Sequence, residues 1–482
     1  MAKDIIAEKI KNCKFLFEER KDEEVPLYAY PAYMKQQNLP MQGFKIHVSA
    51  TFMNADKIFD AAIPYLLKSQ TAFKVVLSSQ LLRLLNEDRF GYSQVGKFIT
   101  VYPHSIAHFV KLLHEIDNLL QDFEAPAVPS DIRFHDTSIV YYRYGVIANP
   151  DNELRLPSGE TIKDERDPNT PIPKWIRDPI QQYKPSHPAT ISKKLLCNRY
   201  IILKVLRQRA KGIVAIALDL ENESLASPKV IILKEARALG ALGEQGIDAI
   251  SRLEKELTLM QKIAPLNICP TPIKFIKNKD RAFLSMEFFE NESLGSIILE
   301  KKTIPEATLI RLCIKIGEKL SKLHARSIYV ADISPTNILI GTSGEVLFVD
   351  FEYAVYDEER HFEGWEVGTP GFYPKATLLE DIDATLAQKL VYKDLFAFGN
   401  VVLAVLAPKW YHSIVEAKHA FLLVDGSWNI SQALAGHSEL VRSICQKTNL
   451  LSSERYASVD ELIQDLQRLV TNIEYGYNQR DQ

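Results

Sequence analysis

Strand-like and helix-like patterns of apolar residues alternate along the first third of the chain. Residues 44–49 alternate apolar and polar side chains with a period of two, which is typical of a half-buried strand. Apolar stripes with helical spacing follow Asn54, a candidate N-cap, and recur from Ile106 onward. Three further segments rich in β-branched and aromatic residues are predicted to be strands: 73–79, 97–102 and 139–147. Together these elements predict one domain over residues 1–147.

The periodic pattern stops at residues 148–190. This stretch is dense in proline, aspartate and asparagine, so we interpret it as a linker between two domains. Trp175 and Ile176 are its candidate points of attachment to a domain.

Residues 191–482 begin with strand-like segments and end with helical ones. An apolar stripe over residues 309–323 predicts one helix, and a capping box from Ser458 to Glu461 predicts the start of the last helix. Strands followed by helices favour a two-lobed α+β domain. The predicted fold class of the chain is therefore α+β.

The composition narrows the class of protein. The 482 residues include 58 lysines and arginines against 61 aspartates and glutamates, and this net charge of −3 argues against a nucleic-acid binder. The five cysteines lie far apart without a CxxC pair, so we expect neither a disulfide framework nor a zinc site. The N-terminus lacks a signal peptide, and the most apolar stretch, residues 396–407, is too short to span a bilayer. We therefore expect a cytoplasmic protein without a membrane partner.

Residues 323–354 carry the most informative motif. Asp332 and Asn337 form a D-x-x-x-x-N pattern, and Asp350 follows after two strand-like runs joined by a Ser-Gly turn. Phosphoryl transfer needs a carboxylate that orients the attacking hydroxyl, and oxygen ligands that hold Mg²⁺ against the phosphates. We assign the catalytic role to Asp332 and the metal-binding role to Asn337 and Asp350.

This stretch resembles the catalytic and metal loops of protein kinases, and other kinase-like segments occur in the expected order. Residues 230–237 resemble the strand that carries the phosphate-binding lysine, and residues 285–294 resemble the hinge that receives the adenine. The resemblance implies ATP or GTP and Mg²⁺ as cofactors. The candidate nucleotide-binding residues are Lys234, its expected ion-pair partner Glu256, Gly212, Glu287 and Phe289.

Three features depart from the protein-kinase pattern. The phosphate-covering loop over residues 207–220 has one glycine, Gly212, in place of three. The catalytic loop has Val-Ala-Asp in place of His-Arg-Asp, and Glu352 stands where the metal motif has glycine. A pseudokinase that keeps the fold without the chemistry is thus an alternative. An active kinase is favoured because four residues keep their order and spacing: Lys234, Asp332, Asn337 and Asp350.

Basic side chains on the N-terminal strands form a second candidate site. Lys45 and His47 are two residues apart and share one strand face, which taken alone fits a solvated face better than a ligand site. Further cations lie in or beside the other predicted strands: Lys74, Lys97, Arg143 and Arg133. Lysines flanked by apolar strand residues are costly unless an anion binds near them, so the set predicts an anion-binding pocket.

The segments 44–50, 73–79, 96–103 and 140–145, followed by a kinase-like domain, resemble the first two domains of class III lanthipeptide synthetases. The N-terminal domain of that family is related to bacterial phosphothreonine lyases. The resemblance implies a phosphothreonine-lyase-like domain followed by a two-lobed protein-kinase-like domain. It also implies a two-step dehydration of a leader-containing precursor peptide. The kinase domain phosphorylates Ser or Thr, and the lyase domain removes the phosphate by β-elimination to leave dehydroalanine or dehydrobutyrine.

By motif match, the resemblance also assigns roles in the lyase domain. Lys74 is the general base for the α-proton, and His47 is the general acid for the departing phosphate. Neighbouring cations would lower the pKa of a lysine from about 10.4 toward the ~7–8 that a base needs, and a bound phosphate dianion would keep His47 protonated. The residues assigned to phosphate binding are Lys45, Lys97 and Arg143, with Arg133 and Tyr102 as further candidates.

The resemblance leaves alternatives open. Class III synthetases carry a third, cyclase domain, whereas this chain ends just after the last kinase-like helix. A separate cyclase partner, linear dehydrated products and an excised piece of a longer protein each fit that length. The favoured function is a bifunctional dehydratase. The other two are a lyase with an inactive, leader-binding kinase fold, and a signalling Ser/Thr kinase with a phosphopeptide-binding module.

Overall fold

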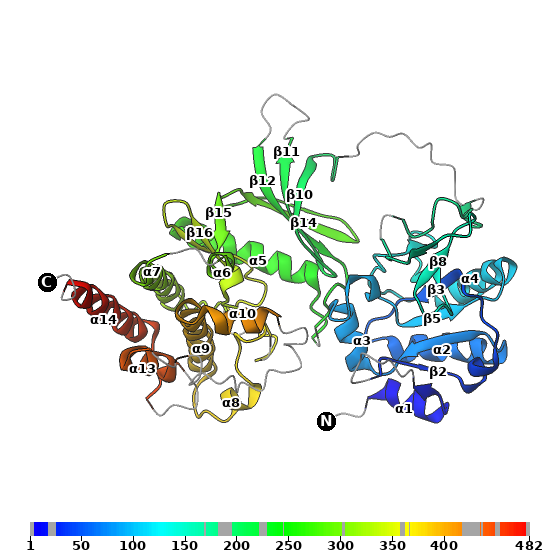
Figure 1. Cartoon of the computed structure of the whole chain (residues 1–482), viewed down its shortest axis with the longest axis horizontal. Coiled ribbons are helices and arrows are strands. Elements are labelled where there is room, and N and C mark those ends of the chain that lie inside the picture. The colour runs from blue at the N-terminus through cyan, green and yellow to red at the C-terminus, as the bar shows by residue number, and fades with distance from the viewer. Residues whose placement is uncertain are drawn as a thin grey trace. The chain divides into compact units, whose positions relative to one another are not determined.

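The computed structural model describes most of the chain, shown in Figure 1. The described residues are 4–17, 26–167, 170–181, 195–220, 229–243, 245–300, 304–356, 362–365, 367–416, 434, 437–448 and 454–478. The chain forms two compact units. The first comprises residues 1–229, 233–251 and 276–283, and the second comprises 230–232, 252–275 and 284–482. The domain boundaries predicted from the sequence, at residues 147 and 190, stay predictions.

A seven-stranded sheet forms the centre of the N-terminal region, with the strand order β1-β2-β4-β5-β3-β7-β6. Every neighbouring pair in this sheet is antiparallel. The strands are β1 (Leu16–Phe17), β2 (Tyr28–Tyr30), β3 (Gln42–Val48), β4 (Ala72–Val76), β5 (Ile99–Tyr102), β6 (Ile132–Arg133) and β7 (Val140–Val146). The helices are α1 (Ile5–Asn12), α2 (Ala55–Lys68), α3 (Ser79–Asn86) and α4 (Ile106–Leu120).

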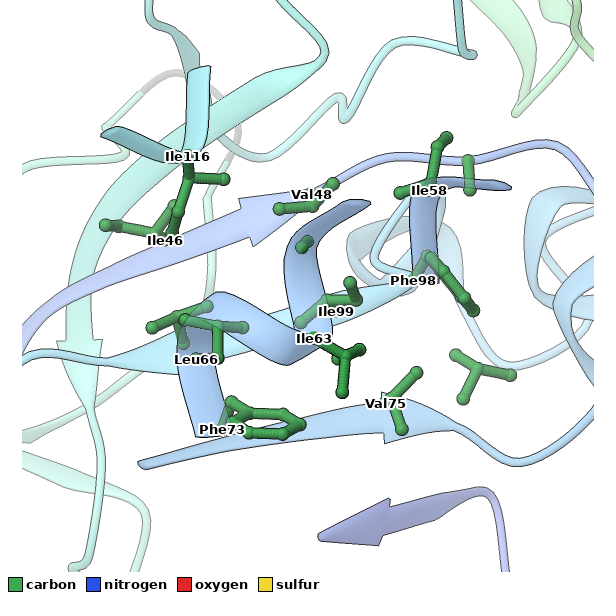
Figure 2. Packing of buried hydrophobic residues seen from close by; sticks show 14 of the residues in the cluster. Ile46, Val48, Ile58, Ile63, Leu66, Phe73, Val75, Phe98, Ile99 and Ile116 are labelled. Atoms are coloured by element: carbon green, nitrogen blue, oxygen red, sulfur yellow. The ribbon is translucent and has the colours of Figure 1, made fainter. Parts of the chain in front are cut away.

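The apolar face of this sheet packs against α2 and α4. Figure 2 shows Ile63 and Leu66 of α2, and Ile116 of α4, among the apolar side chains of β3, β4 and β5. The alternation predicted for residues 44–49 is correct, because Ile46 and Val48 belong to this core. The polar side chains between them are also buried: Lys45 is 8% exposed and His47 is 3% exposed. The solvated strand face considered for these two residues is therefore wrong.

Local details differ from the sequence prediction at two helix starts. Asn54 precedes α2 as expected, but its side chain accepts hydrogen bonds from the backbone N–H and the hydroxyl of Thr51 instead of capping the helix. The strand predicted over residues 73–79 ends at Val76, because Ser78 caps α3 by accepting a hydrogen bond from the Leu81 N–H. Side-chain hydrogen bonding thus decides where these elements begin and end.

The stretch interpreted as a linker is structured over most of its described part. It contains the antiparallel pair β8 (Glu153–Arg155) and β9 (Thr161–Lys163). Ile180 is buried in the core of the N-terminal sheet, and Asp178 accepts a hydrogen bond from the Tyr142 hydroxyl at 3.0 Å. Asp178 and Ile180 thus attach this stretch to the N-terminal sheet, and residues 182–190 of the predicted linker lie outside the described residues.

The C-terminal region begins with a five-stranded sheet of order β10-β11-β12-β14-β13, followed by helix-rich structure. Its strands are β10 (Tyr200–Arg209), β11 (Gly212–Asp219), β12 (Lys229–Arg237), β13 (Pro272–Lys277) and β14 (Arg281–Glu287). A small sheet follows, made of β15 (Asn291–Ser293), β16 (Ile338–Gly341) and β17 (Val346–Phe348). The helices named below are α5 (Ala249–Ile263), α6 (Leu294–Leu299), α7 (Glu306–His324), α8 (Ala376–Glu380), α9 (Leu386–Leu406), α10 (Pro408–Glu416), α13 (Glu439–Lys447) and α14 (Val459–Asn478). This order of strands and helices confirms the predicted α+β class.

Helix α9 is a long and largely apolar helix, and most of its residues are buried. Within the described part of the chain, no single helix has the length and apolar composition to cross a membrane. Helices α9 and α10 pass that test only as a pair bent by 110°.

Candidate active sites

Polar side chains form a row across the N-terminal sheet, on the face opposite the apolar core. Lys74 on β4 is paired with Thr100 on β5, and Thr100 is paired with His47 on β3. The row continues through Tyr141 on β7 to Arg133 on β6. Directly opposed residues of antiparallel strands share a face, so the sheet register brings together the predicted base, Lys74, and the predicted acid, His47.

A second pair lies beside this row. Lys45 is two residues from His47 on β3 and is directly opposite Arg143 on β7. Both side chains are buried, with exposed fractions of 8% and 3%. Tyr102 lies two residues from Thr100 on β5, opposite Ala72. The structure therefore places these predicted phosphate-binding residues on one face of one sheet.

Asp131 joins the predicted acid to one of the predicted phosphate ligands. Its carboxylate lies 2.5 Å from Nδ1 of His47 and 3.1 Å from Nζ of Lys97, and the Ser130 hydroxyl donates to it at 2.8 Å. The Asp131 side chain is fully buried. Burial would raise the pKa of Asp131, but Lys97 and His47 outweigh that effect and hold it well below its usual range. The sequence analysis did not select Asp131. The available signal was a Ser-Asp pair directly before the short apolar and basic segment that contains Arg133.

Asp164 is the second buried carboxylate beside these basic side chains. It pairs with both terminal nitrogens of Arg143, at 2.7 and 3.4 Å, and accepts a hydrogen bond from the Val146 N–H at 3.0 Å. A Cβ atom at Gly145 would lie 2.6 Å from the Asp164 carboxylate, so only glycine permits this approach. Within the described part of the chain, Nε of Arg143 is a buried donor without a hydrogen-bond partner. This nitrogen is the donor that a bound anion would satisfy.

Burial changes the ionisation of the central cations. It lowers the pKa of Lys45 well below its usual value, with Arg143 and Lys97 acting in the same direction. Burial also lowers the pKa of Lys97 to about 8, although Asp131 opposes the change. The pKa of His47 is lowered to about 3 by burial, against the opposing effect of Asp131. Without a phosphate the imidazole is therefore neutral, whereas the sequence prediction considered only the phosphate-bound state.

The predicted base is less enclosed than Lys45, Lys97 and Arg143. Lys74 is partly buried, and its ammonium group lies 3.9 Å from the centre of the Tyr28 ring on the neighbouring strand β2. At the other end of the row, Nε of Arg133 donates to the Tyr141 hydroxyl at 2.7 Å. The contact between Lys74 and the ring is a cation–π interaction, which fixes the position of the predicted base beside β2.

The second site lies in the C-terminal region, where backbone and amide groups fix Asp332. One carboxylate oxygen accepts from the Thr369 N–H at 2.7 Å, and the other accepts from the Asn337 side-chain amide at 3.1 Å. The Asn337 amide nitrogen also donates to the Asp332 backbone carbonyl at 3.1 Å. Since its nitrogen is engaged in this way, Asn337 offers its amide oxygen as the ligand for a cation.

Asp394 of α9 holds the loop that carries Asp332. Asp394 accepts hydrogen bonds from the N–H groups of Val330 and Ala331, at 2.9 and 2.8 Å, and lies 2.9 Å from Nε2 of His324. Ala331 has a positive φ of 61°, a strained conformation that these two hydrogen bonds hold in place. A buried carboxylate thus fixes the Val-Ala-Asp loop without the histidine and arginine of the usual motif.

Asp350 adds a second carboxylate to this site. It has a φ of 68°, in the left-handed region that aspartate tolerates better than most residues. Burial raises the pKa of Asp332, and the nearby Asp350 raises it further. On the other side of the loop, Nζ of buried Lys393 donates to the Val367 carbonyl at 3.2 Å. The Asp350 carboxylate and the Asn337 amide oxygen match the hard oxygen ligands that Mg²⁺ prefers.

The remaining predicted nucleotide-binding residues lie on the expected elements. Lys234 is on β12, and Glu256 is on α5 with 2% of its surface exposed. Glu287 is the last residue of β14. The Phe289 ring packs against Gly341, where an added Cβ atom would lie 2.5 Å from the ring. A Cβ at Gly212 would lie 1.9 Å from the Glu235 carbonyl oxygen, so this glycine is required by strand packing. That structural reason is independent of phosphate binding.

Comparison with protein families gives two matches along the chain. The model of the protein kinase domain matches residues 209–465, more than half of the sequence. This chain belongs to the protein kinase family. The model described as RamC, N-terminal domain, matches residues 19–190. The two matches, in this order in one chain, confirm the resemblance to class III lanthipeptide synthetases that the motifs indicated.

Individual relatives fall into two groups. "Probable SapB synthase" of Streptomyces coelicolor is 29% identical over 356 residues, which cover 70% of this chain and 37% of that protein. Among kinases, "MAP3K epsilon protein kinase 2" of Arabidopsis thaliana is 27% identical over 45% of this chain and 15% of its own length. "Serine/threonine-protein kinase PknA" of Nostoc is 20% identical over 57% of this chain and 48% of its own length. This chain therefore spans less than half of each of these relatives.

Proposed function

We propose that this chain is a bifunctional peptide dehydratase that phosphorylates Ser and Thr of a precursor peptide and then eliminates the phosphate. The observation that carries the proposal is the row of basic residues on the N-terminal sheet, in the same chain as a protein kinase domain. A kinase that only signals has no need of a buried cationic pocket with a candidate base and a candidate acid. The similarity to "Probable SapB synthase" supports the same proposal.

In the phosphorylation step, Asp332 accepts a hydrogen bond from the peptide hydroxyl and takes its proton. Asn337 and Asp350 would hold Mg²⁺, which neutralises phosphate charge when bound. Within the described residues, no group of three or more His, Cys, Asp or Glu side chains is arranged to bind a metal by itself. This fits a metal that completes its coordination with nucleotide phosphates and water. Lys234, Glu256, Glu287 and Phe289 are the candidate nucleotide contacts.

In the elimination step, Lys74 takes the proton from Cα of the phosphorylated residue. The electron pair of that C–H bond forms the Cα–Cβ double bond, and the Cβ–O bond breaks to release phosphate. His47 protonates the departing oxygen, and Asp131 keeps its ring oriented through Nδ1. A phosphate dianion in the pocket offsets the charges of Lys97 and Lys45. It would therefore raise the pKa of His47, so that the acid becomes charged when substrate arrives.

The phosphate-binding set follows from the same contacts. Nε of Arg143, which lacks a partner among the described residues, is the candidate donor to a phosphate oxygen. Lys45 donates to the Val146 carbonyl at 2.8 Å and lies across the strand pair from Arg143, so both reach the same part of the pocket. Arg133 is held by Tyr141 at the end of the row and would contact the peptide or its phosphate.

Mass spectrometry tests both steps separately. A synthetic phosphothreonine peptide, incubated with the intact chain and no nucleotide, should lose phosphate and give the dehydrated product. A Ser/Thr-rich precursor peptide with its leader should lose one water per modified residue when ATP and Mg²⁺ are added. Phosphorylation without any elimination from either peptide would instead support the signalling kinase. Elimination without phosphorylation would support the lyase with an inactive kinase fold.

A further inference from the structure

Residues 362–365 of the kinase region are anchored at two places. Glu363 pairs with Arg252 of α5 through a two-pronged contact: Nε of the arginine lies 2.9 and 3.0 Å from the two carboxylate oxygens. A terminal nitrogen of Arg252 lies 2.5 Å from the second of these oxygens. Both side chains are buried, with exposed fractions of 4% and 7%.

The aromatic residues on either side of Glu363 form the second anchor. The rings of Phe362 and Trp365 lie 4.5 Å apart. They pack against a buried cluster formed by Tyr329, Val355 and Leu390. Tyr329 is three residues before the catalytic Asp332, so this anchor connects residues 362–365 to the catalytic loop.

These anchors lie between the two parts of the phosphoryl-transfer site. In sequence, Glu363 stands between the metal-binding Asp350 and Thr369, whose N–H holds Asp332. On α5, Arg252 is one helical turn before Glu256, the predicted partner of the nucleotide-binding lysine. The Arg252–Glu363 pair therefore fixes the face of α5 that carries Glu256 and the chain segment that leads to Thr369.

Other charged and aromatic side chains surround the Arg252–Glu363 pair. The Tyr353 ring centre lies 5.5 Å from the Arg252 guanidinium carbon. Glu352, the residue that departs from the usual metal motif, is buried in the same neighbourhood. Burial lowers the pKa of Lys255 to about 8, while Glu363 and Glu352 oppose that change. The glutamate in the metal motif thus belongs to a buried charge cluster around α5.

In regulated protein kinases, a phosphate added to the activation segment pairs with arginines and orders the segment. Here the residue before Asp332 is Ala331, and the anion that pairs with an arginine is already present as the Glu363 carboxylate. We infer that the Arg252–Glu363 pair replaces activation-segment phosphorylation, so the kinase region transfers phosphate without first being phosphorylated itself. This inference rests on the phosphorylation step of the proposed function.

The experiment starts from the intact chain after treatment with a protein phosphatase, with intact mass spectrometry to show that no phosphate remains. Two properties are measured: the initial rate of peptide phosphorylation, and hydrogen exchange of the amides of residues 362–365. The wild-type chain should keep its rate within about twofold and its protection in hydrogen exchange. Glu363→Gln should lower kcat by up to about 10²-fold, because a catalytic loop that is displaced by even 1 Å loses the alignment of its reacting groups. The amides of residues 362–365 should exchange faster in the variant.

Matched variants separate this role from simple misfolding. Glu318→Gln removes an exposed carboxylate from α7 and should change neither property. The double variant Arg252→Glu with Glu363→Arg restores the pair with reversed charges, and it should recover at least part of the rate lost in Glu363→Gln. Glu363→Asp keeps the charge and should fall between wild type and Glu363→Gln. Dehydration of a phosphothreonine peptide should be unchanged in all of them.

The outcomes distinguish this inference from the proposed function. A phosphatase-treated wild type that loses its rate and regains it after autophosphorylation overturns the inference. The same conclusion follows if Glu363→Gln keeps both the wild-type rate and the wild-type protection. A wild-type chain that protects residues 362–365 but never phosphorylates the precursor peptide overturns the proposed kinase step.

Discussion

The two candidate active sites carry opposite buried charges. On the N-terminal sheet, the buried side chains include three basic groups and two carboxylates: Lys45, Lys97 and Arg143 with Asp131 and Asp164. In the kinase region, Asp332 and Asp350 lie close enough to raise the pKa of Asp332. A buried excess of one sign is costly unless a ligand supplies the other. The comparison shows that the buried groups favour an anion at the first candidate site and a cation at the second.

The sites also differ in how they are built. The first lies on neighbouring strands of one sheet, where register alone sets which side chains are opposed. The second is assembled from loops that are held by buried side chains such as Asp394 and Arg252. We therefore expect the first site to depend on its own side chains. The second should depend as much on its anchors.

The largest expected effect is on the cation site. Asp350→Asn removes a carboxylate ligand, so phosphorylation of the precursor peptide with ATP and Mg²⁺ should fall below detection by mass spectrometry. Dehydration of a phosphothreonine peptide should continue at the wild-type rate, because that step needs no metal. Asp383→Asn, an exposed aspartate after α8, is the matched control and should leave both steps unchanged. Undiminished phosphorylation by Asp350→Asn would contradict the assigned metal site.

Lys74→Ala should break the anion site in the complementary way. Without its base, the lyase step should stop, and phosphopeptide should accumulate at one phosphate per modified residue. Phosphorylation itself should be unaffected. Lys111→Ala, an exposed lysine on α4, serves as the control. Fully dehydrated product from Lys74→Ala at the wild-type rate would exclude the proposed mechanism, and unphosphorylated peptide would point to a role in substrate docking.

His47→Ala should slow elimination without stopping it. General acid catalysis is typically worth about 10²–10⁴-fold, and phosphate held by cations can still leave as the dianion. The rate of phosphate release from a phosphothreonine peptide measures this loss. A His47→Ala rate equal to that of wild type would show that the leaving group needs no acid.

Asp131→Asn tests whether the buried carboxylate orients His47 and Lys97. The amide keeps the shape but loses the negative charge that lies against His47 and Lys97, so elimination should fall by up to about 10²-fold. The phosphorylation rate should be unchanged, and kcat should fall more than the affinity for phosphopeptide. Asp122→Asn, an exposed aspartate after α4, provides the comparison. If kcat and the fraction of folded protein fall by the same factor, Asp131 has only a structural role.

The smallest effect is a shift of the pH profile of the cation site. The pKa of Asp332 is raised by burial and by Asp350, so it takes up a proton at a higher pH than an ordinary aspartate does. That proton competes with a bound cation, and phosphorylation should therefore fall as the pH drops through the raised pKa. Higher Mg²⁺ concentrations should move this acid limb to lower pH. An acid limb that does not respond to Mg²⁺ would contradict the coupling.

Much of this protein was predictable from the sequence because the relevant signals are local. The alternation in residues 44–49 fixed which side chains of β3 face the core, since the side-chain period of a strand is two. The spacing of Asp332, Asn337 and Asp350 follows from one loop and the short β-hairpin after it, so the kinase family could be recognised.

The tertiary structure decided the features that depend on distant contacts. Asp131 lies 84 residues from His47 in sequence, and only the tertiary structure brings the two together. Asp164 lies in a stretch that composition marks as a linker, yet its carboxylate fixes Arg143. The neutral state of His47 likewise depends on burial and on neighbours from other strands. The sequence by itself thus determined the residue types and their order along each element. Their partners, their burial and hence their ionisation were decided only by the tertiary structure, because these depend on which distant segments pack around each group.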